Sequence, residues 1–163
     1  GGQEMTLPER AVFDCNVLLQ ALLSSRGPAG RLLEAAKTGK LALFISAYGI
    51  DELRDVASRP SVQRKFRVSQ QMIDDFCRDL VGHATVMESV PHVFEFPRDP
   101  DDAHYIDLAV AANAKLVVSR DKDLLSLRDP TTTEGKDLAA RFPGLEILTP
   151  PEALRRLDAA ENE

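Results

Sequence analysis

The sequence of 163 residues has no tryptophan, two cysteines and three histidines, and each scarcity excludes a class of site. Cys15 and Cys77 are too few for a disulfide framework and stand in no metal-ligand spacing, which indicates a protein of the reducing cytoplasm. The three histidines, at positions 83, 92 and 104, are too scattered to predict a histidine metal site. No apolar run reaches the roughly 20 residues that cross a bilayer, so no membrane association is expected.

Positive charge is also in deficit, because 26 acidic residues face 20 basic ones and give a formal charge of −6. This sign excludes binding of nucleic acid by bulk electrostatic attraction. It leaves open a nucleic-acid enzyme whose carboxylates are concentrated in a metal site. Glycine-rich phosphate loops, G-x-S-x-G, H-E-x-x-H and C-x-x-C motifs are all absent from the sequence.

The length and composition predict one folded domain. Hydrophobic residues make up 44% and charged residues 28%, which argues against disorder. Residues 1–10 are interpreted as a cloning remnant and a disordered N-terminus, since Gly-Gly precedes Met5 without the layout of a signal peptide. The domain is expected over residues 11–157, with a C-terminal tail over 158–163.

Short apolar runs alternate with helical patterns, which is typical of a parallel sheet covered by helices. Asn16 is a candidate cap for the first helix, and residues 85–87 are an ambiguous edge strand. A polar loop is expected over residues 128–135. The predicted strands are 11–13, 41–45, 115–119 and 145–148, and the predicted helices are 16–22, 29–37, 46–58, 69–81, 100–114 and 150–157.

Four carboxylates are expected to meet at one edge of this sheet. Asp14 and Asp121 each follow a predicted strand, and ligands of open parallel sheets bind beyond the carboxyl ends of the strands. Asp102 lies in the first turn of the helix that leads to the Asp121 strand, and Glu52 lies in the helix after the second strand. Taken singly, each could be only a helix cap or a surface charge.

Clustered carboxylates repel one another, so a fold tolerates them where a cation is bound. Oxygen ligands suit Mg²⁺ or Mn²⁺, and one or two ions are expected. The other aspartates of these segments, Asp99, Asp101, Asp107 and Asp123, are interpreted mainly as caps and surface charges.

Four segments carry a resemblance that covers residues 11 to 157. Residues 12–19 (VFDCNVLL), 98–102 (RDPDD), 117–125 (VVSRDKDLL) and 147–154 (ILTPPEAL) are similar, in this order, to motifs of the PIN-domain ribonucleases. The chain most resembles the prokaryotic, VapC-like members that are toxins of toxin–antitoxin pairs. The resemblance implies a PIN-like three-layer α/β/α sandwich with a central, mainly parallel sheet.

The resemblance also implies roles for individual residues. Asp14, Glu52, Asp102 and Asp121 match the family's catalytic and metal-binding acids, and Asp123 is an auxiliary metal ligand. Asp101 is the alternative to Asp102 if the helix starts earlier. Two supporting residues are implied: Asn16 would orient Asp14, and Ser119 would bind a ligand carboxylate or a substrate phosphate. Cys15 replaces the commoner Thr or Ser and is interpreted as tolerated, not catalytic.

The implied activity is metal-dependent cleavage of single-stranded or structured RNA, leaving 5′-phosphate and 3′-hydroxyl ends. A small antitoxin protein and a second copy of the chain are the expected partners. Residues 59–67 hold four cations and no acid, so Arg64, Lys65 and Arg67 are candidate RNA contacts beside the cleft; a solvated basic turn is the alternative. The apolar stripe of Met72, Ile73, Phe76 and Leu80 is either core or a dimer face.

Two other functions remain open at this stage. A haloacid-dehalogenase-like phosphatase also begins with a strand that ends in Asp, but Asn16 stands where that family has its second acid. A non-catalytic RNA-binding or partner-binding module of the same fold is the other alternative. The complete acidic set argues against the latter.

Overall fold

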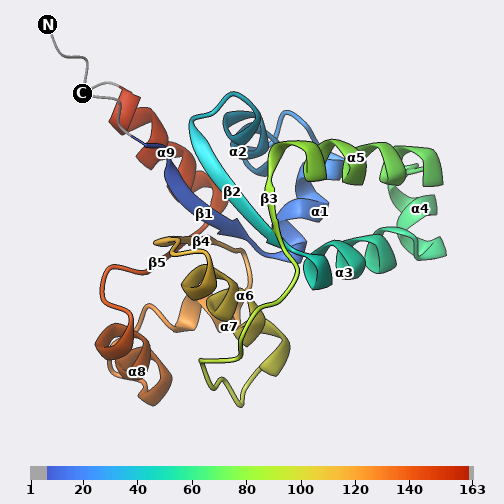
Figure 1. Ribbon diagram of the computed structural model, residues 1–163. Helices are drawn as coiled ribbons and strands as arrows, with labels where there is room; N and C mark the ends of the chain where they lie inside the picture. The colour runs from blue at the N-terminus through green and yellow to red at the C-terminus, as the bar shows by residue number, and fades with distance from the viewer. Residues whose placement is uncertain (1–6, 162–163) are drawn as a thin grey trace, which may run out of the picture.

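A sheet of five strands, each parallel to its neighbours, forms the centre of the computed structural model, which describes residues 7–161 (Figure 1). The strand order is β3-β2-β1-β4-β5, so the first strand of the chain lies in the middle. The predicted α/β class with a parallel sheet is confirmed. The strands are β1 (Glu9–Phe13), β2 (Leu41–Ser46), β3 (Thr85–Met87), β4 (Leu116–Val118) and β5 (Glu146–Leu148).

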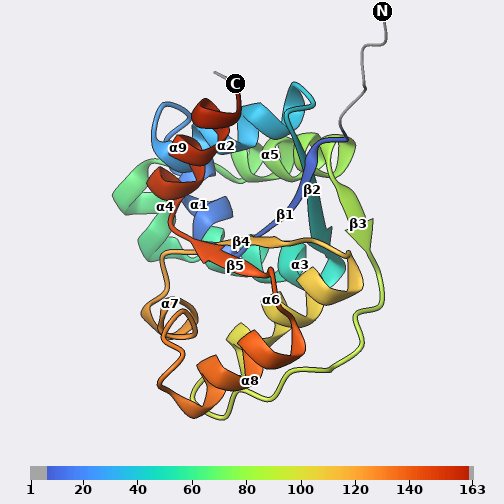
Figure 2. The same ribbon diagram turned by 90° about the vertical axis from the view of Figure 1, so that its left-hand side faces the viewer.

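Helices cover both faces of the sheet and complete three layers (Figures 1 and 2). Helices α6, α7 and α8 lie on one face, while α1, α2, α5 and α9 lie on the other, and α3, α4 and α5 extend to one side as an arm. Within residues 7–161, no helix combines the length and the apolarity needed to cross a membrane. The helices are α1 (Cys15–Leu23), α2 (Pro28–Lys37), α3 (Ala47–Ala57), α4 (Pro60–Phe66), α5 (Gln70–His83), α6 (Pro100–Ala111), α7 (Lys122–Ser126), α8 (Thr133–Arg141) and α9 (Pro150–Glu161).

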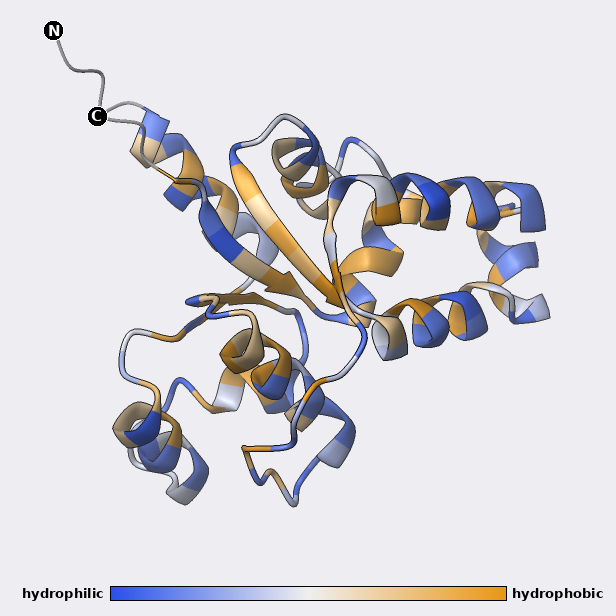
Figure 3. Cartoon of the chain, viewed as in Figure 1, coloured by the Kyte–Doolittle hydropathy of each residue, from blue (hydrophilic) through white to orange (hydrophobic). Residues whose placement is uncertain are grey.

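The core lies where the apolar strands meet the inner faces of the helices (Figure 3). Every residue of β4 is buried, as expected for a strand covered on both faces. The register pairs Phe13 of β1 with Val118 of β4, so the residues that follow these two strands, Asp14 and Ser119, emerge side by side. The sheet therefore fixes the first element of the acidic site.

Several predicted boundaries were wrong. Strand β1 starts at Glu9 and helix α9 runs to Glu161, so the domain extends beyond the predicted 11–157 at both ends. The physical reason is ion pairing: Arg156 of α9 contacts Glu9 and Glu146, each at 2.9 Å, which ties the last helix to β1 and β5. The rest of the predicted cloning remnant and tail, residues 1–6 and 162–163, lies outside the described residues.

Other local predictions are corrected by capping interactions. Asp14 caps α1 and accepts from the Val17 N–H, so Asn16 is not the cap. Part of the predicted loop 128–135 is helical, because the Thr132 hydroxyl accepts from Gly135 N–H and starts α8. The ambiguous segment 85–87 forms the edge strand β3 beside β2.

The connector between β3 and α6 is held by Asp107. This residue was expected to be a cap or surface charge, but it is only 4% exposed. Its carboxylate accepts from the backbone N–H groups of Val93 and Phe94 at 2.9 and 2.8 Å and contacts the ring of His92 at 2.8 Å. Phe94, which is part of this connector, is fully buried. The connector leads directly to Asp99 at the start of α6.

Candidate metal centre

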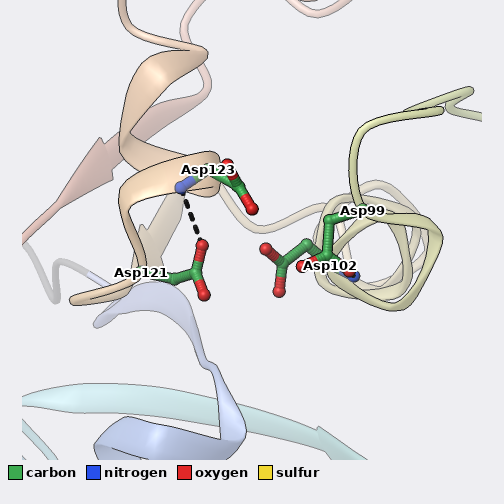
Figure 4. Close-up of side chains that lie close together, drawn as sticks. All are labelled: Asp99, Asp102, Asp121 and Asp123. Atoms are coloured by element: carbon green, nitrogen blue, oxygen red, sulfur yellow. Dashed lines mark hydrogen bonds between the residues drawn. The ribbon is translucent and has the colours of Figure 1, made fainter.

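Four aspartates converge at the carboxyl end of β4. One carboxylate oxygen from each of Asp99, Asp102, Asp121 and Asp123 lies within 4.8 Å of the others. Figure 4 shows the first two on α6 and the last two on α7, pointing toward one another across the gap between the helices. We call these four residues the aspartate cluster.

The cluster exists because the first turns of two helices face each other. Asp99 caps α6 and accepts from the Asp102 N–H at 3.2 Å. Asp121 caps α7 and accepts from the N–H groups of Asp123 and Leu124 at 2.8 and 3.3 Å. Carboxylates are favoured at helix N-termini, so capping and clustering arise from the same residues.

Asp102 is the most constrained member of the cluster. Its side chain is buried, and its Oδ2 atom has no hydrogen-bond partner. Burial raises the pKa of the Asp102 carboxyl, and the neighbouring Asp121 and Asp99 carboxylates raise it further. Among residues 7–161, no Lys or Arg forms an ion pair with the cluster. A buried, unpartnered carboxylate oxygen among other carboxylates fits a hard divalent cation.

Asp14 is joined to the cluster through Ser119. Asp14 is 3% exposed, and it accepts from the Val17 N–H at 2.9 Å and from the Ser119 hydroxyl. The same hydroxyl oxygen accepts from the Asp121 N–H at 2.9 Å. Burial raises the pKa of Asp14 to about 6, with smaller contributions from Asp121 and Glu52. Ser119 thus contacts Asp14, whose role as a metal ligand stays a prediction, while Asn16, expected to orient Asp14, lies exposed on α1.

Glu52 approaches Asp14 from α3. The hydroxyl of Tyr105 donates to the Glu52 carboxylate at 3.2 Å and accepts from the Cys15 backbone N–H at 3.2 Å. The charge of Glu52 contributes to the raised pKa of Asp14, as expected for two acids that lie near each other. Burial, followed by the charge of Glu52, raises the pKa of the Cys15 thiol to about 12. That thiol stays protonated, which agrees with its non-catalytic interpretation.

The predicted acids are therefore placed in two groups. Asp102, Asp121 and Asp123 belong to the aspartate cluster, whereas Asp14 and Glu52 flank it. Asp101 is exposed and outside the cluster, which favours Asp102 over Asp101 as the proposed ligand. Sequence reasoning assigned Asp99 only as a cap; its position three residues before Asp102 is the signal that the two share a helix face.

The predicted RNA contacts lie in a different setting from the one expected. Arg64 and Lys65 are exposed on the short helix α4, and Arg67 ends it in a left-handed conformation with φ 55°. Figure 1 places α4 at the tip of the arm, beyond the end of α3 that is remote from the strands. The segment is helical and lies away from the strand ends, so its predicted place beside the cleft was wrong; its contact with RNA stays a prediction.

The apolar stripe of α5 is mostly core. Ile73 and Leu80 are buried and Phe76 packs against the core. Met72 is 45% exposed, so only this end of the stripe is available to a partner.

Comparison with known proteins identifies the family of the chain and finds its fold in solved structures. Residues 10–123 match the family model described as PIN domain. The uncharacterized protein MJ1680 of Methanocaldococcus jannaschii is 26% identical over 149 residues, which cover 91% of this chain and 92% of that protein.

Two solved structures share the fold. A chain in the crystal structure of VapBC2 from Rickettsia felis, bound to a DNA fragment from their promoter, superposes with a TM-score of 0.53 at 13% identity. The match covers 86% of this chain and 98% of that one. PAE2754 from Pyrobaculum aerophilum superposes with a TM-score of 0.55 at 21% identity, covering 96% of this chain and 94% of that one.

Proposed function

Because the chain belongs to the PIN domain family, we propose that it is a metal-dependent endoribonuclease that cleaves single-stranded RNA. The observation that carries the proposal is the buried Oδ2 of Asp102, which has no hydrogen-bond partner and lies among three other carboxylates. A bare cluster of this kind repels a phosphodiester. It becomes a site for one when a cation is bound.

The proposed metal ligands are Asp14, Glu52, Asp102, Asp121 and Asp123, with Asp99 as a further member. One or two Mg²⁺ or Mn²⁺ ions would supply Lewis-acid chemistry, which attracts the phosphate and makes water a better nucleophile near neutral pH. Ser119 orients Asp14 and fixes the backbone at Asp121. Tyr105 orients Glu52. No side chain acts as a covalent nucleophile in this proposal.

The test is cleavage of an end-labelled single-stranded RNA with Mg²⁺, with Mn²⁺ and with EDTA. Asp14→Asn and Asp121→Asn should abolish cleavage, and products should carry 5′-phosphate and 3′-hydroxyl ends. Asp101→Asn is the matched control, because Asp101 is exposed beside Asp102 and outside the cluster. Cleavage that survives EDTA, or that survives both site variants, contradicts the proposal.

The alternatives are separated by the same assay. The phosphatase alternative loses support from the family match; hydrolysis of a small phosphate ester without RNA cleavage would restore it. A non-catalytic module would bind RNA without cleaving it. The acidic set at the strand ends favours the enzyme.

Toxin function in a toxin–antitoxin pair is part of the proposal. It is supported by the fold shared with a chain of the VapBC2 complex. The expected partner is a small antitoxin, and a neighbouring reading frame for a small DNA-binding protein is the observation that tests it. Growth arrest on expression, relieved by that partner, is the corresponding result in cells. A cytoplasmic location and a homodimer complete the proposal, and light scattering tests the latter.

A further inference from the structure

A cavity is lined by Arg120, the residue before Asp121 of the aspartate cluster, and by none of the four aspartates themselves. It measures about 470 Å³ and is lined by Gln20 of α1, Ser24 and residues 27–29 before and at the start of α2, Arg120 after β4, and residues 149–151 after β5. This volume is within the range of small-molecule sites. We call it the Arg120 pocket.

Arg120 connects the pocket to the acidic site along the chain. It stands between Ser119, whose hydroxyl donates to Asp14, and Asp121, which belongs to the aspartate cluster. The two neighbours of Arg120 therefore contact or form the acidic site, while the Arg120 residue itself lines the pocket.

The lining has the chemistry of a nucleotide site. The chain carries an excess of acidic residues, yet no carboxylate lines the pocket, and its only charged side chain is that of Arg120. Pro28, Pro150 and Pro151 supply apolar walls, and Gln20 and Thr149 supply polar groups. Within residues 7–161, the exposed side chains of Arg120 and Gln20 form no hydrogen bond or ion pair, so both are available to a ligand.

The wall formed by the segment 24–29 is fixed in place. A side chain on Gly30 would lie 2.5 Å from the carbonyl oxygens of Ser24 and Ser25, so this loop rests directly on α2. The Gly27 N–H also donates to the Ser24 hydroxyl at 3.2 Å. The pocket is therefore preformed, which lowers the entropic cost of binding.

We propose that the Arg120 pocket binds the nucleotide next to the cleaved bond, with Arg120 on its phosphate and Gln20 on the edge of its base. The proposal rests on the ribonuclease function proposed above and adds a source of sequence preference to it. Phosphate contacts position a nucleic acid, whereas contacts to base edges specify it. The two side chains therefore have different consequences for the substrate.

The test compares steady-state cleavage of a randomised single-stranded RNA by wild type and two variants. Arg120→Ala should raise KM about tenfold for all sequences, as expected for loss of one hydrogen bond to a charged group. Gln20→Ala should relax the base preference at one position next to the cleaved bond and leave the other positions unchanged. Wild-type KM and base preference in both variants would overturn the proposal.

A binding experiment tests nucleotide binding by the pocket independently of RNA cleavage. Titration of 5′-mononucleotides in EDTA, followed by backbone NMR, should shift the amides of Ser24, Ala29 and Arg120. Ser24→Trp, which fills the pocket, should abolish these shifts, and Ser89→Trp is the matched control on an exposed residue after β3. Absence of these chemical-shift changes at millimolar mononucleotide overturns the proposal. The same result is expected if the natural occupant of the pocket is a protein segment. If no RNA is cleaved but these shifts occur, the proposed function fails and the nucleotide site stands.

Discussion

Tyr105 of α6 donates a hydrogen bond to Glu52 of α3 across 3.2 Å, although 53 residues separate them in the sequence. The same phenolic oxygen accepts from the backbone at Cys15, directly after Asp14. One side chain thus fixes the α3 carboxylate relative to the start of α1. Tyr105 is a positioning residue in the proposed reaction.

Tyr105→Phe should retain the fold and weaken the apparent affinity for Mn²⁺ in the cleavage assay. Removing such an outer partner of a ligand typically costs about 10- to 100-fold in affinity or activity. The measurement is the cleavage rate as a function of Mn²⁺ concentration. Glu52→Gln provides the comparison: if it is inactive while Tyr105→Phe keeps the wild-type metal dependence, the positioning role is wrong.

Asp102→Asn should raise the melting temperature in EDTA or leave it unchanged. The substitution removes one charge from a crowded cluster, and the same change should reduce the stabilisation by Mn²⁺. A ligand that binds only the native state adds about 2.7 kcal/mol at a hundredfold excess over its Kd. Asp101→Asn, the exposed neighbour, should keep the full response. An Asp102→Asn variant that is less stable in EDTA and responds to Mn²⁺ like wild type would identify Asp102 as structural only.

The metal-free protein should be more stable at pH 5 than at pH 7.5. Burial raises the native pKa of Asp14 from 3.8 to about 6, so the native state binds a proton more tightly than the unfolded state. Its contribution is fully present only below the unfolded pKa of 3.8 and is lost as pH rises through 6, so the part lost between pH 5 and pH 7.5 is about 1.4 kcal/mol. The pKa of the Asp102 carboxyl is also raised, so it changes the stability in the same direction. Carboxyl groups whose pKa is lowered, such as that of Asp129, change the free energy of unfolding only below about pH 4. They therefore do not oppose the loss of stability between pH 5 and pH 7.5.

Urea denaturation in EDTA at the two pH values measures this effect, and Asp14→Asn should reduce the difference. His92, whose pKa is raised by Asp107, acts in the same direction, whereas burial lowers the pKa of His104, which acts in the opposite direction. The contribution of Asp14 is therefore read from the difference between wild type and Asp14→Asn, in which both histidines are unchanged. Millimolar Mn²⁺ should remove or reverse the pH dependence, because it binds the ionised carboxylates. Equal urea midpoints at both pH values contradict the prediction.

Removal of the α4 cations should weaken RNA binding and flatten its salt dependence. The variant is Arg64→Ala, Lys65→Ala and Arg67→Asn, with asparagine chosen because it tolerates the left-handed backbone at position 67. Each lost phosphate contact should reduce the slope of log K against log salt by about 0.7 for a single strand. Because α4 lies at the tip of the arm, a long RNA should be affected more than a short one. An unchanged slope with both RNAs would make α4 an ordinary solvated helix.

The sequence pattern predicts the parallel sheet together with Asp102 and Asp121, because strand ends and helix starts are local signals, and the family resemblance adds Asp123. Asp99 was predicted only as a cap, since nothing local shows that the N-termini of α6 and α7 face each other. The sequence shows that Tyr105 lies on an apolar helix face, but its hydrogen bond to Glu52 depends on how α3 and α6 pack. The position of α4 was predicted wrongly, because a short basic run in the sequence does not show in which direction α3 extends from the sheet.

The central position of β1 has a consequence for synthesis of the chain. Asp14 emerges from the ribosome early, but its partner Ser119 is 105 residues further along the chain. The strand that carries Ser119 pairs directly with β1, so that side of β1 stays open until β4 has been made. The acidic site is therefore absent from nascent chains and from any fragment that stops before β4. For the proposed ribonuclease, this order of synthesis means that a nascent chain has no acidic site with which to attack the message being translated until β4 has been made.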